Sequence, residues 1–378
     1  MRWLILTFTL LLLPVTTAVT ASFPSNNFGK KQKSGVSAKP VTGGAQQRMQ
    51  FRGRPPLEPI EILGNAWEIY ASGVIDADAA TRLKTYIDEN KIPGRSILFL
   101  HSPGGSLIGG MKLGQTIRDA GLYTYVGQDS GDPYKFMIPG QCYSACTLAF
   151  LGGKFRWVDS ASIYGVHRFN FTAKISQDID VTQIMSASIV QYIRDMGVDP
   201  KLFSAMTTAS SDSMTVLSQK QLKQLKVVND GVDSTYWTIE TVKNAFYLKG
   251  TRETWRGVNK FMLVCEPGKG ITLSVIFDPE GHGDVALQMK AYSLDIGHKT
   301  IPISNHLYIP PTLSQESGWI KVAFLLDKDL LAAIQSAKAV GVMFQFAYDA
   351  PVFLGFVGMD FSEGAQKLPA LVAHCPPR

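Results

Sequence analysis

The chain has 378 residues, of which 45% are hydrophobic, 10% aromatic and 18% charged, so it can bury one large core or two ordinary ones and is not disordered throughout. Its formal net charge is +6, but residues 1–60 carry +7 and the remainder carries −1. A nearly neutral folded body excludes nucleic acid as the expected partner.

The first 21 residues have the three-part pattern of a secretory signal. Arg2 precedes an apolar run from Trp3 to Leu13, and small residues lead to Ala21. The pattern predicts cleavage after Ala21. An uncleaved anchor is the alternative, but the run is shorter than the ~20 residues that cross a bilayer, and no later segment qualifies. We therefore expect a periplasmic or secreted protein with no transmembrane segment after cleavage.

Residues 22–59 are predicted to form a basic, disordered linker. Seven basic side chains and one acidic side chain lie between residues 22 and 60, among Gly, Ser, Gln and Pro residues. Such a linker is either a solubilising spacer, which we favour, or a contact for anionic lipid or cell-wall polymer.

Residues 60–235 alternate between strand-like runs and helical patterns. Asp76 caps a helical pattern whose apolar residues share one face, and SILFLH (96–101) is a continuous apolar run typical of a buried parallel strand. The alternation predicts an α/β domain in which helices cover a mostly parallel sheet. The expected helices are 76–91, 106–120, one starting near Ser144, 179–196 and 218–226, and the other expected strands are 122–127 and 162–167.

Residues 250–378 have a different pattern, in which short strand-like runs are separated by turn residues. This pattern predicts a β-rich, sandwich-like second domain. Phe344, Phe346 and Tyr348 belong either to its core, which we favour, or to a binding face. The expected strands are 260–265, 271–277, 286–292, 320–326, 341–348 and 352–358, and helix-like pieces occupy 327–339 and 360–373.

The chain contains four cysteines, which allow three pairings in an exported protein. Joining Cys265 to Cys375 closes a loop of 110 residues, which the chain-entropy model values at about 4.7 kcal/mol, so this pairing is preferred. Cys142 and Cys146, one helical turn apart, are expected to be buried thiols or a strained bond. No CxxC pair or HExxH is present, so neither a metal nor another cofactor is expected.

Two segments carry residues suited to nucleophilic chemistry. In HSPGGSLIGG (101–110), glycines follow a buried strand and precede a helix, so bare amides can face a developing negative oxygen; a plain turn is the alternative. In GQCYSACTLAFLGG (140–153), Ser144 lies at a helix start beside the Ala145 amide. His167 ends a predicted strand 23 residues later and can take the serine proton, unless it is an ordinary core histidine.

These segments, with KFRWVDSASIYGVH (154–167), resemble three ordered motifs of the Clp protease proteolytic subunit over about residues 60–231. The resemblance implies a ClpP/crotonase fold of stacked β-β-α units in a spiral. It implies Ser144 as nucleophile, His167 as general base, and Gly105 and Ala145 as oxyanion donors. Arg156 resembles a structural basic residue of that motif, with a surface charge as the alternative. A crotonase acting on acyl-CoA is the competing member of the superfamily.

The sequence departs from that family where its orienting aspartate would stand. Met214 occupies that position, three residues before Leu217, and the nearest carboxylate is Asp212. Either Asp212 completes a triad or a Ser-His dyad remains; Asp178 and Asp180 are weaker candidates. A dyad remains an enzyme, because losing the orienting acid slows the chemistry without abolishing it.

The export signal and second domain also separate the chain from the cytoplasmic Clp subunit, and the layout resembles exported Clp-like proteins. We therefore expect an exported serine hydrolase, most simply a peptidase acting on a peptide or protein substrate. No ATPase partner is assumed, and a homo-oligomer, a trimer, is suggested by the superfamily alone. A catalytically inactive binding or scaffold protein of the same fold is the alternative.

Overall fold

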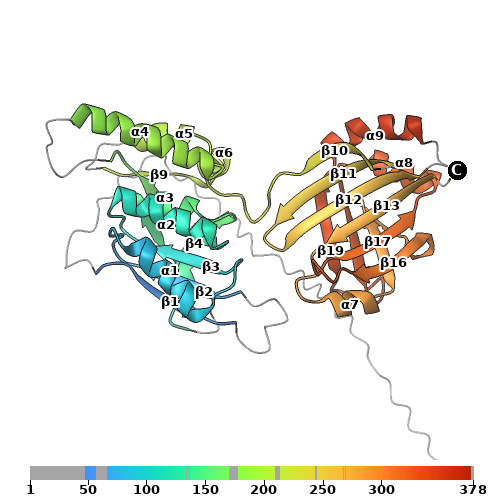
Figure 1. Ribbon diagram of the computed structural model, residues 1–378, viewed down its shortest axis with the longest axis horizontal. Coiled ribbons are helices and arrows are strands. Elements are labelled where there is room, and N and C mark those ends of the chain that lie inside the picture. The colour runs from blue at the N-terminus through green and yellow to red at the C-terminus, as the bar shows by residue number, and fades with distance from the viewer. Residues whose placement is uncertain are drawn as a thin grey trace, which may run out of the picture.

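The computed structural model describes residues 47–56, 66–132, 135, 137–169, 178–208, 213–242, 245–266, 268 and 270–375. It shows a mixed α/β protein with several sheets (Figure 1), which confirms the predicted α/β class. The described residues form two hydrophobic cores that share no side chain, one between Met49 and Val228 and the other between Trp237 and Cys375. The predicted signal peptide and most of the predicted linker lie outside the described residues.

The first core is built on a sheet in which β2, β3 and β4 run parallel, with β1 and β5 antiparallel at its two ends and β7 parallel beside β4. The predicted buried run at 96–101 is the central strand, and its Leu98, Phe99 and Leu100 are fully buried. The strands of this sheet are β1 (Gln50–Arg54), β2 (Glu68–Ser72), β3 (Ile97–His101), β4 (Tyr123–Gln128), β5 (Ile138–Pro139) and β7 (Arg156–Trp157).

A second, smaller sheet continues from the end of β3. In it β6 (Gln141–Tyr143) runs parallel to β8 (Ile163–Val166), which pairs antiparallel with β9 (Thr215–Val216). Ser102 joins the two sheets, because its amide donates to the Gln141 carbonyl at 2.8 Å and its carbonyl accepts from the Tyr143 amide at 3.0 Å. The strand ends of β3, β6 and β8 therefore lie next to one another.

Five helices of this half match the predicted ones, but α5 was not predicted, and α1 begins after Asp78 rather than at the predicted cap Asp76. Ser106 caps α2 by accepting from the Gly109 amide at 3.1 Å. Helices α2 and α3 cross in close contact, because a Cβ atom at Gly110 would lie 2.4 Å from the Ala145 carbonyl oxygen. The helices are α1 (Ala79–Asn90), α2 (Leu107–Asp119), α3 (Ala145–Leu151), α4 (Asp178–Asp195), α5 (Lys201–Thr208) and α6 (Gln219–Gln224).

The second core lies between two antiparallel sheets, with strand orders β10-β11-β12-β13-β17-β16 and β15-β14-β18-β19. Aromatic rings from the two sheets meet in it: the centroids of Phe277 and Phe344 are 5.1 Å apart. The strands are β10 (Tyr236–Val242), β11 (Ala245–Thr254), β12 (Gly257–Glu266), β13 (Gly270–Phe277), β14 (Ala291–Asp295), β15 (Thr300–Pro302), β16 (Leu307–Leu313), β17 (Ile320–Leu325), β18 (Ala339–Gln345) and β19 (Leu354–Asp360). The helical pieces are α7 (Gly283–Gln288), η2 (Ser304–His306), α8 (Lys328–Gln335) and α9 (Ser362–His374).

Three details of the second half differ from the prediction. Its sheet begins at Tyr236 rather than near residue 250. The segment expected as a strand at 286–292 starts inside helix α7, since Ala286 and Met289 are buried at helical spacing. Phe344 is fully buried, as favoured, whereas the side chains of Phe346 and Tyr348 are 58% and 51% exposed.

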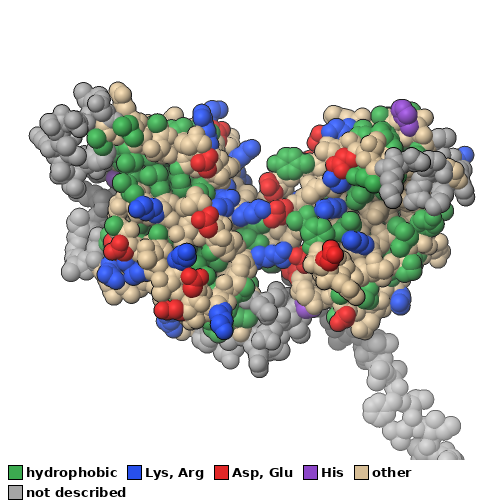
Figure 2. All heavy atoms as spheres, viewed as in Figure 1, with side chains coloured by type: hydrophobic (Ala, Val, Ile, Leu, Met, Phe, Trp, Pro, Cys, Tyr) green, Lys and Arg blue, Asp and Glu red, His purple; other side chains and the backbone are tan. Residues whose placement is uncertain are grey.

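The two halves meet through polar groups. Arg95 Nη2 lies 2.8 Å from Asp278 Oδ2, and the Tyr123 hydroxyl donates to the Trp255 carbonyl oxygen at 3.0 Å. Figure 2 shows charged side chains of both signs gathered where the halves face each other. Beside these polar contacts, Trp157 of the first half and Trp255 of the second both lie against Gly231. Each half nevertheless has its own hydrophobic core.

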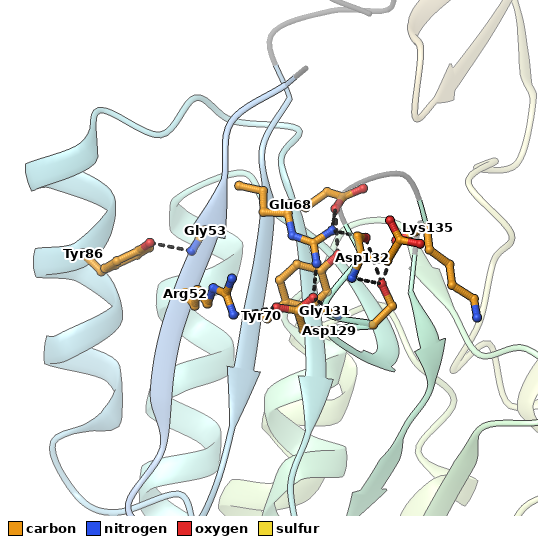
Figure 3. Close-up of polar contacts among 11 residues, drawn as sticks. Arg52, Gly53, Glu68, Tyr70, Tyr86, Asp129, Gly131, Asp132 and Lys135 are labelled. Atoms are coloured by element: carbon orange, nitrogen blue, oxygen red, sulfur yellow. Dashed lines mark hydrogen bonds and ion pairs between the residues drawn. The ribbon is translucent and has the colours of Figure 1, made fainter. Parts of the chain in front are cut away.

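Strand β1 corrects the prediction that residues 22–59 form only a linker. Arg54 pairs with Asp129 and Glu68 and lies over the Tyr70 ring (Figure 3). The Tyr70 hydroxyl donates to Glu68 Oε2 at 2.7 Å, and burial raises the pKa of Glu68. Basic residues near the end of the predicted linker are thus the counter-charges of acidic groups on the sheet, which composition alone does not reveal.

Two disulfides are present. Cys265 in β12 is bonded to Cys375 just after α9, with their Cα atoms 5.7 Å apart, and Cys142 is bonded to Cys146. Disulfides persist in oxidising compartments, so the chain folds in one. Within the residues that the structure describes, no helix has the length and apolar character needed to span a membrane.

Candidate active site

Three parallel strands deliver the predicted site residues to one edge. Strand β3 leads into Gly104 and Gly105, β6 leads directly into Ser144, and β8 leads directly into His167. Because β6 pairs with β8 and with the residue that follows β3, these strand ends are neighbours. Carboxyl ends of adjacent parallel strands are where α/β proteins gather ligand-binding groups.

Ser144 occupies a sharp strand-to-helix turn. Its φ is 55° and its ψ is −125°, a conformation that a residue with a Cβ atom rarely adopts. The Ser144 amide donates to the Gly165 carbonyl of β8 at 3.0 Å, which ties the turn to the neighbouring strand. The side chain is partly exposed, and its Oγ makes no hydrogen bond within the described part of the chain. The hydroxyl is therefore free to react.

The two glycines after β3 lie against this turn. A Cβ atom at Gly104 would be 2.6 Å from the Ser144 Cβ atom, so only glycine fits beside the serine. The Gly104 amide is already bonded to Ser102 Oγ at 3.1 Å, whereas the exposed Gly105 amide has no acceptor among the described residues. The Ala145 amide, the first of α3, also lacks one. Both predicted oxyanion donors are thus unengaged.

His167 follows β8 directly and is partly exposed. Its Nδ1 atom is buried and has no hydrogen-bond partner in the residues that the structure describes. Within those residues, no hydrogen bond joins the His167 ring to Ser144. In unliganded hydrolases this hydrogen bond often forms only when the substrate binds.

The residue opposite His167 is Met214. The pairs Gly165 with Val216 and Val166 with Thr215 place Met214 next in the antiparallel register. Met214 is 8% exposed, and its Cγ atom would lie 2.8 Å from a Cβ atom at Gly165, so an apolar residue stands at the position where the resemblance implies an orienting acid. Asp212 lies outside the described residues, and Asp178 and Asp180 fall on the first turn of α4.

The Cys142–Cys146 bond could not be predicted firmly from the four-residue separation of the two cysteines. At a spacing of one helical turn, where disulfide geometry is poor, either buried thiols or a strained bond is expected. In the structure Cys142 belongs to strand β6 and Cys146 to the first turn of α3, with their Cα atoms 5.3 Å apart. Both are fully buried, as expected. The bond therefore spans the turn that contains Ser144.

Arg156 is structural, and the surface-charge alternative is wrong. It is 3% exposed, and burial lowers its pKa to about 10. Its guanidinium donates to the carbonyl oxygens of Val227, Gly153 and Lys226 at 2.7, 2.8 and 2.9 Å. These contacts join the segment after α6 to the end of α3, the helix that begins directly after Ser144.

His101 is a site neighbour that the sequence reasoning passed over. Its Nδ1 accepts from the Gln141 amide at 3.1 Å, and burial lowers its pKa. The ring is therefore neutral and fixes the start of β6. The signal that singled out His167, a histidine at the end of a buried strand, also applies to His101.

The arrangement offers a free hydroxyl, an imidazole at the adjacent strand end and two unengaged amides, which are the parts needed for acyl transfer. Among the described residues, no three His, Cys, Asp or Glu side chains form a group that could hold a metal.

Comparison with known proteins adds little to this geometry. No model of a protein family matches the chain, and no curated protein does. Among solved structures, the chain is similar to a mutant of the 1510-N membrane-bound stomatin-specific protease, with 18% sequence identity and a TM-score of 0.31. That match covers 43% of this chain and 75% of the other.

Proposed function

We propose that the protein is an exported serine hydrolase, a peptidase of the ClpP/crotonase type, whose β-β-α spiral spans residues 60–235. The observation that supports the proposal is that the ends of β3, β6 and β8 lie next to one another, and Gly105, Ser144 and His167 follow these three strand ends. The predicted export signal at residues 1–21 and the two disulfides support a location in the periplasm or outside the cell.

In the proposed reaction, Ser144 Oγ attacks the carbonyl carbon of a peptide bond while His167 accepts its proton. The carbonyl oxygen becomes an oxyanion that the Gly105 and Ala145 amides bind. Collapse of this intermediate breaks the carbon–nitrogen bond, and His167 gives its proton to the leaving amine. Water then attacks the acyl-serine by the same route and releases the acid.

We infer a Ser-His dyad as the simplest catalytic unit. Met214 is opposite His167, and the buried Nδ1 atom has no acceptor among the described residues. Asp212 remains the candidate for a third member. The proposal includes a homo-oligomer, a trimer, and assumes neither a cofactor nor an ATPase partner.

The same observation favours a second candidate function, a catalytically inactive binding or scaffold protein. An imidazole without an orienting partner is a poorer base, because nothing fixes its tautomer or its ring. The two candidates make opposite predictions for the reactivity of Ser144.

Labelling with a fluorophosphonate probe separates them. The full-length exported chain should form a covalent adduct that peptide mapping places on Ser144, and Ser144→Ala should form none. Ser130→Ala, in a surface turn of the same half, is the matched control and should label as the wild type does. Labelling that persists in Ser144→Ala, or a folded wild type that never labels, would favour the inactive scaffold.

A further inference from the structure

We propose that the Cys142–Cys146 disulfide is a positioning element for the nucleophile: it holds the strand-to-helix turn in the geometry that presents Ser144. This inference rests on the proposed function, in which Ser144 attacks the substrate. It assigns a role to two buried cysteines that neither touch the substrate nor join distant parts of the chain.

The bond encloses the turn completely. Cys142 is the middle residue of β6 and Cys146 is the second residue of α3, so the ring that they close contains Tyr143, Ser144 and Ala145. Both cysteines are 0% exposed, while Ser144 is partly exposed. The bond therefore fixes the buried side of the turn and leaves the serine on its open side.

The turn needs such a restraint because of its backbone. At φ 55° and ψ −125°, Ser144 is in a region that costs free energy for any residue with a Cβ atom and persists only where the surroundings hold it. Hydrogen bonds hold it on two sides: its amide donates to Gly165 O at 3.0 Å, and its carbonyl accepts from the Thr147 amide at 2.9 Å. The disulfide adds the covalent restraint between strand and helix.

The side chain of Ser144 has no restraint of its own. Its Oγ makes no hydrogen bond in the described part of the chain and does not cap α3. The position of the Ser144 Cβ atom, from which Oγ projects, thus depends on the backbone turn. Ser144 also lies against Gly104, so rotation of the turn would move the nucleophile relative to the Gly105 amide. Displacements of about 1 Å at a reacting group cost roughly 10²-fold in rate.

The test compares two double variants of the full chain. Cys142→Ala with Cys146→Ala removes the short bridge, and Cys265→Ala with Cys375→Ala removes the long one and serves as the matched control. The fluorophosphonate reaction is resolved into its maximal inactivation rate and its half-saturating probe concentration, at a temperature where circular dichroism shows both variants folded. We expect the maximal rate to fall roughly 10²-fold in the first variant only, with half-saturation unchanged within about twofold.

Two further readouts separate positioning from general loss of structure. The pH at which the maximal rate is half of its plateau should stay the same in the first variant, because His167 is untouched. Hydrogen exchange of the peptide containing residues 143–147 should quicken, while exchange of the second core should not change.

If the first variant does not fold, Cys142→Ala with Cys146→Val, which fills more of the buried volume, takes its place. The maximal rate should fall in this variant as well. A folded protein without the short bridge that reacts as fast as the wild type would overturn the proposal. An unreactive wild type would end the proposed function instead, and the exchange measurement would still decide whether the bridge holds the turn.

Discussion

Each half of the molecule contains one disulfide, and the two bonds differ in what they constrain. Cys142 and Cys146 are four residues apart and enclose one turn, whereas Cys265 and Cys375 are 110 residues apart and join β12 to the end of α9. By chain entropy the short loop contributes about 2 kcal/mol and the long one about 4.7 kcal/mol. The long bond acts mainly on the unfolded chain, and the short bond acts on the geometry of the folded one.

The contrast shows that unfavourable local structure lies around the short bond. In the first half, a non-glycine residue at positive φ, a buried imidazole nitrogen without a partner and two unengaged amides lie around the short bond. Such features cluster at functional sites because the surrounding fold holds them in place. The long bond joins β12 to the residue after α9, and no described residue within five positions of either cysteine is a non-glycine residue at positive φ or has a buried side-chain atom without a partner.

The largest expected effect is that of His167→Ala. It should slow the reaction of Ser144 with a fluorophosphonate by about 10³-fold, because a positioned general base contributes 10² to 10⁴. Thermal unfolding should change little in either half. The check is the inactivation rate near neutral pH, with His298→Ala in the second half as control. Equal rates for wild type and His167→Ala would show that His167 takes no part in the reaction. The short bond would then have no catalytic role.

The next largest effect is on stability. Cys265→Ala with Cys375→Ala should lower the free energy of unfolding by about 4 kcal/mol, because the unfolded chain regains the entropy of a long loop. Denaturant unfolding measures this loss. A loss no larger than that of the double variant lacking the short bond would contradict the division of roles between the two bonds.

Arg156→Met should cost about 3 kcal/mol, because it leaves several buried carbonyl oxygens without donors. The loss should appear in the first half alone, as faster hydrogen exchange in α3 and in residues 225–229. Arg156→Lys keeps the charge and part of the hydrogen bonding and should cost less. If Met and Lys are equally harmful, the carbonyl contacts are not the cause.

Met214→Asp is expected to raise the probe reaction about tenfold, because it would place a carboxylate opposite His167 where it can orient the ring. Met214→Asn has a similar shape without the charge and is the matched control. Since Met214 is buried, both variants should lose some stability, which denaturant unfolding would show. A rate for Asp no higher than for Asn would show that His167 needs no acid, or already has one.

The smallest effect concerns Asp76. Its hydrogen bonds to Arg82 lower its pKa from 3.8 to about 2, so the pair stabilises the fold fully above pH 3.8 and ceases to do so as the pH falls through 2. Asp76→Asn should cost no more than about 1 kcal/mol near neutral pH, since water screens the pair. The difference from the wild type should vanish at about pH 2. Asp78→Asn, whose side chain caps nothing, is the control. A difference that persists in acid would assign the effect to packing.

Much of the fold could be predicted because the local pattern of apolar residues agrees with which residues are buried. SILFLH is β3, the run at 271–277 is β13, and the helix expected from Ser144 is α3. Alternation of strand and helix was enough for the α/β class. The strand expected at 286–292 is wrong at its start, which belongs to α7, and right at residues 291–292, which begin β14. A short apolar run fits helix and strand alike, and burial at every third residue settles the choice.

Parts of the site depend on long-range pairing, which no short window of sequence contains. That Met214 is opposite His167 follows from the register of β8 and β9, whose strands lie about fifty residues apart in the chain. The choice between buried thiols and a bond for Cys142 and Cys146 could not be made from spacing, because the boundary between strand and helix falls between them. The role of Asp212 stays a prediction.

Strand β1 has a consequence for proteolytic trimming of the exported chain. Cleavage before residue 47 would spare the folded body, but cleavage after Arg54 would remove the cation from Asp129 and Glu68 and strip β2 of its antiparallel neighbour. The new sheet margin would offer unpaired amides and carbonyls to a second chain, so a shortened protein should self-associate. An enzyme that trims the chain without exposing this margin must therefore cut upstream of Gln50.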